Sequence, residues 1–150
     1  MPAIATILWQ SFVQAVWLFA PCYMANMAPV GAARLMPRWD APVDAGRRMR
    51  DGTRVLGAKK TWRGFAAGAC AGAATCALQW LLAAGPVADF DFGRADGVPV
   101  WAAAAFGAVL GIMALVGDSV KSFFKRRAGR ASGSSWFPFD QLDFVVTGLL

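Results

Sequence analysis

Three long apolar segments alternate with shorter polar ones along the sequence. They run from about Ile4 to Tyr23, from about Gly64 to Ala84, and from about Val98 to Val116. Each is close to the roughly 20 residues that a helix needs to cross about 30 Å of hydrocarbon. The second segment holds no formally charged residue at all. The pattern therefore predicts three transmembrane helices.

A fourth apolar segment, Phe144–Leu150, stands at the end of the sequence. It is too short to cross a bilayer as a helix, so we expect either a C-terminally truncated chain or an end that tucks into the bundle. The predicted fold class is all-α: a polytopic transmembrane helix bundle with three full spans, the start of a fourth, and two cytoplasmic polar loops. Residues 1–150 are expected to form a single membrane-embedded domain.

The charges between the apolar segments predict the orientation of the bundle. Residues 27–63 carry nine Lys or Arg against three Asp, and residues 119–139 carry five basic residues. Residues 85–97 instead carry three Asp and one Arg. Basic loops stay in the cytoplasm. We therefore expect a protein of the cell (inner) membrane, with both basic loops and one shared site facing the cytoplasm.

Composition narrows the function further. Hydrophobic residues make up 57% of the chain and charged residues only 16%, which is unlike a soluble domain of this length. The chain has 15 basic residues against 9 acids. In a membrane protein, this excess favours anionic lipid or a phosphorylated ligand over nucleic acid. With no His, the chain has no His-based triad or His-ligated metal. Its three cysteines lie in apolar segments and are interpreted as inert buried thiols.

The first group of candidate residues follows the third apolar segment. If the helix continues, Asp118, Ser122 and Lys125 share one face at i, i+4 and i+7. They would offer a metal ligand, a hydrogen-bonding hydroxyl and a phosphate clamp. The alternative is an interfacial cap in which the basic run Lys125–Arg127 reaches anionic headgroups. That alternative does not explain an acid at the same membrane surface.

The second group is Asp140 and Asp143, which follow Pro138. Capping of a helix start explains one acid well and two less well. Residues at i and i+3 share a helix face, so both carboxylates can point at one cation. Mg²⁺ prefers oxygen ligands and commonly uses one or two carboxylates plus substrate phosphates. A magnesium site is the prediction here.

The third group is the run Lys59–Gly64, immediately before the second apolar segment. Its ammoniums, hydroxyl and guanidinium suit a polyphosphate, although a positive-inside stop with an interfacial Trp would explain the run taken alone. Asn26, Pro29 and the stretch Pro42–Gly46 are interpreted as turn residues of an ordered loop. Glycines every fourth residue, at 64, 68 and 72 and at 107 and 111, predict tight helix packing.

Together these stretches resemble the CDP-archaeol synthases and, more distantly, the phosphatidate cytidylyltransferases. The similarity extends over about residues 25–144 and keeps the order and spacing of several motifs. The matching residues are Ala25-Asn26, Pro29-Val30, Pro42–Asp44 with Gly46, Leu56-Gly57, Lys60–Phe65, Gly117-Asp118, Lys121–Phe123, Lys125–Arg127 with Gly129, and Asp140–Phe144. The sequence departs from the pattern at Ala58-Lys59, where small polar or acidic residues are more usual. It also has Trp136–Phe139 where the bacterial phosphatidate enzymes carry His-Gly-Gly.

The resemblance implies Mg²⁺-dependent transfer of a cytidylyl group from CTP to a membrane lipid phosphate, of the unsaturated archaetidic acid type or phosphatidic acid. The products would be a CDP-lipid, for phospholipid biosynthesis, and pyrophosphate. By motif matching, the metal-binding acids would be Asp118, Asp140 and Asp143, which with Lys125 would be catalytic. The nucleotide or phosphate contacts would be Asn26, Asp44, Lys60, Thr61, Arg63, Ser122 and Arg126.

Two other functions fit a short basic membrane protein. A transporter or channel subunit would place its functional charges near the middle of the membrane, whereas here the charges cluster at one end of the predicted helix bundle. A non-catalytic scaffold that binds anionic lipid would need charge alone, and would leave the three acids Asp118, Asp140 and Asp143 unexplained. The expected partners are CTP, the lipid phosphate and membrane lipids, with no nucleic acid. The sequence leaves the oligomeric state open, a homodimer included.

Overall fold

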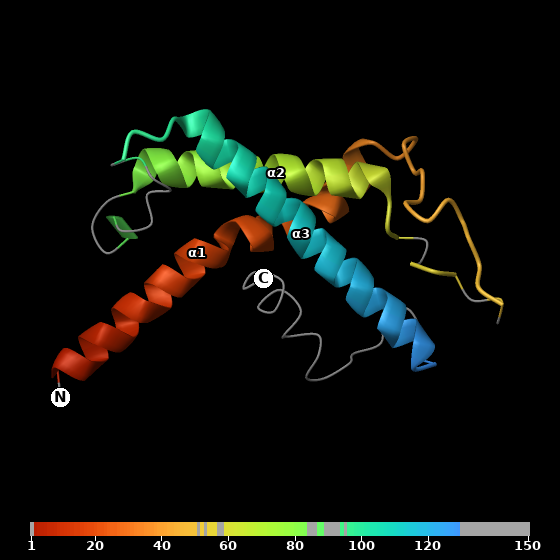
Figure 1. Cartoon of the computed structure of the whole chain (residues 1–150), viewed down its shortest axis with the longest axis horizontal. Coiled ribbons are helices and arrows are strands. Elements are labelled where there is room, and N and C mark those ends of the chain that lie inside the picture. Colours follow the sequence, from red (N-terminus) through yellow and green to blue (C-terminus); the bar gives the residue numbers. More distant parts are fainter. Residues whose placement is uncertain are drawn as a thin grey trace.

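The computed structural model describes residues 2–50, 52, 54–56, 59–83, 87–88, 94 and 96–129. Its long elements are three α-helices, α1 (Pro2–Leu35), α2 (Trp62–Leu82) and α3 (Val100–Arg127), as Figure 1 shows. Each helix is long and apolar enough to cross a membrane. The prediction of an all-α fold with three spans is confirmed for this part of the chain. The expected fourth segment, Phe144–Leu150, lies outside the described residues.

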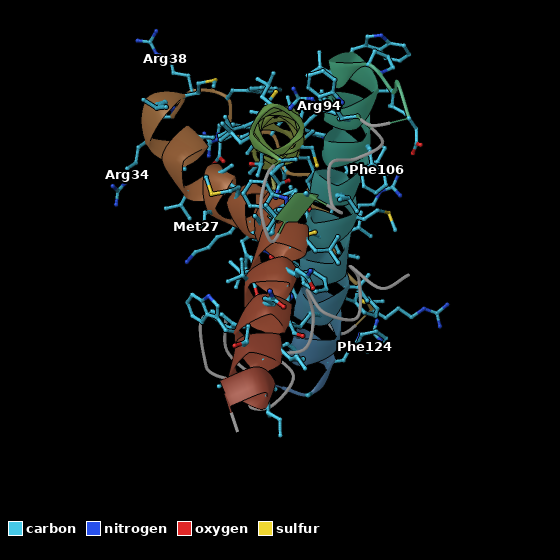
Figure 2. The ribbon with its side chains drawn as sticks, turned by 90° about the vertical axis from the view of Figure 1, so that its left-hand side faces the viewer. Met27, Arg34, Arg38, Arg94, Phe106 and Phe124 are labelled. Atoms are coloured by element: carbon cyan, nitrogen blue, oxygen red, sulfur yellow. The ribbon has the colours of Figure 1, made fainter. Side chains whose placement is uncertain are left out.

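The first helix is longer than its sequence predicts. We expected a span ending near Tyr23 and then a loop, with Asn26 and Pro29 in turns, but α1 runs on to Leu35 through Pro21 and Pro29. The turn prediction is therefore wrong for Asn26 and Pro29, whereas residues 43–46 do lie in turns. Proline removes a helical hydrogen bond and bends a helix, and α1 changes direction part way along (Figures 1 and 2). Membrane helices tolerate this where neighbouring groups satisfy the freed backbone.

Helix α2 lies against the carbonyl groups that the two prolines leave without their usual partner. Because Pro21 has no N–H, the carbonyl of Trp17 has no donor four residues later. The buried side chain of Gln79 supplies one, with its Nε2 donating to that oxygen at 2.5 Å. The Ala25 carbonyl, freed in the same way by Pro29, lies 3.1 Å from where a Cβ on Gly68 would stand. Helix α2 therefore supplies a donor for the carbonyl that Pro21 frees and packs closely beside the one that Pro29 frees.

This compensation can be tested by replacing Gln79 with Leu, which keeps the volume and removes the donor. We expect the variant to lose about 1 kcal/mol of stability, since interhelical hydrogen bonds in membranes are worth about 0.6–1.7 kcal/mol. Thermal unfolding in detergent measures the loss. The matched control is Gln10→Leu, because Gln10 is exposed on α1. Equal unfolding temperatures for Gln79→Leu and wild type would contradict this role.

Helices α2 and α3 approach each other through glycine. Gly68 and Gly72 on α2 and Gly107 and Gly111 on α3 are all buried. A Cβ on Gly111 would stand 2.6 Å from the Gly68 carbonyl oxygen, and one on Gly107 would stand 2.6 Å from the Cβ of Cys76. Real side chains cannot approach so closely, so the predicted tight packing is confirmed. It places the start of α2 beside the last turns of α3.

Candidate active site

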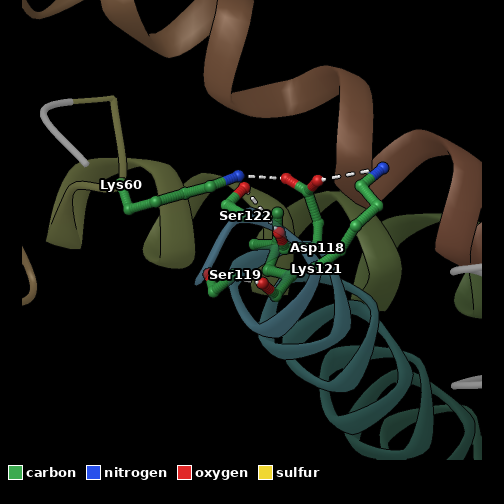
Figure 3. A network of polar contacts seen from close by, with 6 residues as sticks. Lys60, Asp118, Ser119, Lys121 and Ser122 are labelled. Carbon is green, nitrogen blue, oxygen red and sulfur yellow. Dashed lines mark hydrogen bonds and ion pairs between the residues drawn. The ribbon is translucent and has the colours of Figure 1, made fainter. Parts of the chain in front are cut away.

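An ion-pair network connects the start of α2 to α3. The Asp118 carboxylate pairs with Lys60 through Oδ2, although the two residues are 58 positions apart in sequence. On its other side, Asp118 Oδ1 lies 3.5 Å from the Nζ of Lys121 (Figure 3). Side-chain exposure is 28% for Asp118 and below 20% for both lysines. A half-buried acid held between two ammoniums is thus the charged centre of this region.

The loop between α1 and α2 positions Lys60. The Val43 N–H donates to the Lys60 carbonyl at 2.9 Å, and the Trp62 N–H donates to the Ala41 carbonyl at 3.0 Å. Asp44 holds this loop in shape, because its two oxygens accept from the N–H groups of Gly46 and Leu56, each at 3.0 Å. The structure therefore gives Asp44, predicted as a ligand contact, a role in folding the loop.

Thr61 and Arg63 fix the beginning of α2. Thr61 caps the helix, with its Oγ1 accepting from the Gly64 N–H at 3.2 Å. Arg63 is buried and donates from Nη1 to the Met36 carbonyl at 2.6 Å, while its Nη2 lies 3.2 Å from Asp40 Oδ1. These contacts tie the end of α1 to the positive end of the α2 dipole. Such a helix start favours nearby anions.

Two adjoining pockets open beside these residues. The small pocket, of about 180 Å³, is lined by Asn26, Pro29, Val30, Lys59, Lys60, Thr61, Gly64, Phe65, Leu115 and Asp118. The large pocket, of about 600 Å³, is lined by Pro29, Val30, Ala33, Arg34, Asp40, Lys59, Thr61 and Arg63. The two share four lining residues. Their linings hold four basic side chains against two acids, so together they suit a polyanionic ligand.

The structure brings some of the predicted site residues together. Asn26, Lys60, Thr61 and Asp118 line the small pocket, and Thr61 and Arg63 line the large one. Ser122 lies one turn beyond Asp118 and donates its hydroxyl to the Asp118 carbonyl at 2.7 Å (Figure 3). Helix α3 does continue through this face, as the spacing of Asp118, Ser122 and Lys125 required.

Other predicted residues stand apart from the pockets. Lys125 and Arg126 are half-buried on the last turns of α3. Lys125 is seven residues beyond Asp118, about 10 Å along a helix axis, and neither residue lines the two pockets. Asp140 and Asp143 lie outside the described residues. Among the described residues, no group of three acids or thiols is placed to hold a metal ion.

The sequence interpretation missed the contribution of α1. Asn26, Pro29, Val30 and Ala33 follow helical spacing and all line a pocket, as does Arg34 one position later. That spacing was visible in the sequence, but Asn26 and Pro29 were interpreted as turn residues of a loop. Lys121, the second partner of Asp118, was named only as part of the matching stretch Lys121–Phe123.

Comparisons with known proteins give one consistent answer. A family model described as CarS-like, CDP-archaeol synthase, matches residues 7–150. The CDP-archaeol synthase of Thermococcus onnurineus is 38% identical over 149 residues, 98% of this chain and 75% of that protein. The CDP-archaeol synthase of Halobacterium salinarum is 42% identical over 139 residues, 91% of this chain and 70% of that protein.

A solved structure is also similar. It is described as "Structural insight into an intramembrane enzyme for archaeal membrane lipids biosynthesis". The similarity has a TM-score of 0.70 at 34% sequence identity, over 91% of this chain and 74% of that one. Together with the three membrane-length helices, this likeness supports an integral membrane protein.

Proposed function

Because the chain belongs to the CDP-archaeol synthase family, we propose that it transfers a cytidylyl group from CTP to an archaeal-type lipid phosphate. The observation that carries the proposal is the Lys60–Asp118–Lys121 network beside two cationic pockets, at one end of membrane-length helices. An oxygen of the lipid phosphate attacks the α-phosphorus of CTP. The bond from that phosphorus to the oxygen bridging it to the β-phosphorus breaks, and pyrophosphate leaves.

This reaction does not need a histidine. A phosphate monoester has a second pKa of about 6, so it is already largely dianionic at neutral pH. The barrier lies in bringing this anion to an anionic triphosphate and in stabilising the pyrophosphate that departs. Positioning and cationic charge are the main tools for such transfers. The basic side chains around the two pockets supply both.

We assign the phosphates of the substrates to the cations nearest the start of α2. Lys59 lines both pockets, Lys60 lines the small one, and Arg63 lines the large one. The positive end of the α2 dipole, capped by Thr61, adds to their field. Arg63 also keeps this region folded through Met36 and Asp40. Lys125 and Arg126 remain candidates for the headgroup side of the lipid substrate.

Magnesium dependence is part of the same proposal. Mg²⁺ commonly uses one or two protein carboxylates plus substrate phosphates, and Asp118 offers one carboxylate at the small pocket. Asp140 and Asp143 are the further ligands that the sequence predicts. Bound magnesium would neutralise charge that develops on the triphosphate. Lys60 and Lys121 hold the Asp118 side chain, which lines the small pocket, in place.

We further propose that both pockets open to the cytoplasm. Residues 27–63, which supply most of the pocket-lining side chains, carry nine of the 15 basic residues of the chain, and basic segments of this kind stay on the cytoplasmic side. The acidic stretch between α2 and α3 would then lie outside. This orientation gives the site access to CTP from the cytosol and to its lipid substrate from the inner leaflet.

The test is turnover by the purified protein in detergent micelles. With labelled CTP, Mg²⁺ and an ether-linked isoprenoid phosphate, we expect label to enter the lipid fraction and pyrophosphate to be released in equal amount. Chelation of the metal by EDTA should stop the reaction, and added Mg²⁺ should restore it. A diacyl phosphate tested in parallel defines the lipid substrate. Absence of labelled lipid with either phosphate would contradict the proposed function.

A further inference from the structure

An apolar groove of about 500 Å³ lies beside the small pocket and shares Phe65 with it. Its lining is Trp39, Trp62, Phe65, Ala66, Ala69 and Ile112. Nothing in the ion-pair network uses this groove. An apolar groove is common on a membrane helix, but this one adjoins a charged site, and that position indicates a ligand with both a charged and an apolar part.

The groove extends along the helices away from the charged end of the bundle. Its four α2 residues, at positions 62, 65, 66 and 69, follow helical spacing and so share one face. From Trp62 to Ala69 the helix rises about 10 Å. Ile112 lies six residues before Asp118 on α3, about 9 Å along the axis toward the middle of the span. The groove therefore leads from the level of the charged site into the membrane-spanning part.

The residues that line the groove include two large, exposed tryptophans and two small alanines. Trp39 and Trp62 are each about half exposed, at 47% and 54%. Tryptophan is enriched where a membrane meets water, so we place Trp39 and Trp62 at the level of the lipid headgroups. Ala66 and Ala69 leave the room between these rings and Ile112 unfilled. A hydrocarbon chain can thus enter sideways from the bilayer.

We propose that this groove binds the first part of an isoprenoid chain of the lipid phosphate whose head lies in the small pocket. The inference rests on the proposed function and adds to it a binding site for the hydrocarbon tail of the lipid substrate. A lipid phosphate needs cations for its head and an apolar surface for its tail, and the two surfaces meet at Phe65. The small side chains at Ala66 and Ala69 leave space for the methyl branches that distinguish an isoprenoid from a straight chain.

The test is to fill the groove by replacing Ala69 with Phe. We expect the KM for a long-chain isoprenoid phosphate to rise about tenfold or more, within the range by which apolar pockets discriminate. The KM for CTP should stay at the wild-type value, as should turnover of a phosphate whose chains are shortened to one isoprene unit. The matched control is Ala74→Phe, because Ala74 is exposed on the same helix and lines none of these pockets. It should behave like wild type with every substrate.

Binding gives a readout that does not depend on turnover. An isoprenoid phosphate with a photoreactive group near the start of its chain should label residues 62–69 or Ile112 in wild type. The Ala69→Phe variant should lose this labelling, and unlabelled isoprenoid phosphate should compete for it. Labelling without turnover would contradict the proposed function and leave the groove assignment standing. Labelling that a neutral lipid removes equally well, or an unchanged KM in Ala69→Phe, would overturn the groove assignment.

Discussion

Replacing Asp118 by Asn is expected to lower kcat/KM for cytidylyl transfer by about 10²–10³-fold, the loss typical for removal of one electrostatic group from an active site. The variant keeps the shape of the side chain but removes its charge. Lys60 and Lys121 would then face each other without the counterion that now lies between them. The proposed magnesium site would also lose a carboxylate ligand. Turnover of labelled CTP in detergent measures the effect.

Two further variants separate catalysis from folding at this position. Asp96→Asn is the matched control, because Asp96 is exposed in the turn before α3, and it should keep wild-type turnover. The double variant Asp118→Asn with Lys60→Gln removes both charges of this half-buried pair. We expect it to recover thermal stability relative to Asp118→Asn and to stay inactive. Recovery of turnover together with stability would mean that Asp118 only holds the bundle together.

Replacing Gly107 by Leu is expected to prevent assembly of the bundle. A Cβ at this position would collide with the carbonyl oxygen of Gly72 and with the Cys76 side chain. Backbone and a buried thiol cannot move aside as the tip of a flexible side chain can, so α2 and α3 must separate. Overpacking of this kind costs about 1–3 kcal/mol or more. Separation would also move Asp118 away from Lys60, so activity should be lost with the fold.

For Gly107→Leu, the measurements are the yield of monodisperse protein in size-exclusion chromatography and the melting temperature of that protein. Gly31→Leu is the control, because Gly31 is exposed on α1 and a Cβ there has no neighbour within 4 Å. It should be expressed and melt like wild type. If Gly107→Leu gives the same yield and melting temperature as Gly31→Leu, the close contact between α2 and α3 is not required for folding.

The helices themselves were accessible from sequence because the length of an apolar run is a local property. A run of about 20 residues without charges predicts a membrane helix whatever surrounds it, and α2 and α3 begin within two residues of their predicted positions. Where the prediction was wrong, the cause was tertiary. We interpreted Asn26 and Pro29 as turn residues, yet α1 continues through both prolines. Gln79 on α2 donates to the carbonyl that Pro21 frees, and Gly68 packs beside the carbonyl that Pro29 frees.

The candidate site also combines features that could be predicted from the sequence with features that depend on tertiary packing. The sequence predicted a carboxylate and basic side chains in one site, and Asp118 does lie beside Lys60 at the small pocket. The contacts that each side chain makes did not follow from the sequence. Asp44 matched a motif, but its two oxygens are used by backbone N–H groups of its own loop. Lys125 shares a face of α3 with Asp118, but the rise of the helix carries it past the pockets.

From the sequence alone, three membrane-length helices and basic segments concentrated on one side of them could be predicted, because hydrophobic length and charge asymmetry act segment by segment. Which of these charges meet depends on how the helices pack. Lys60 and Asp118 are 58 residues apart, and their pairing depends on glycines that let α2 and α3 touch and on a loop that presents Lys60 to α3. The apolar groove that Phe65 lines likewise exists only where these two helices and Trp39 come together, since no single segment contains it.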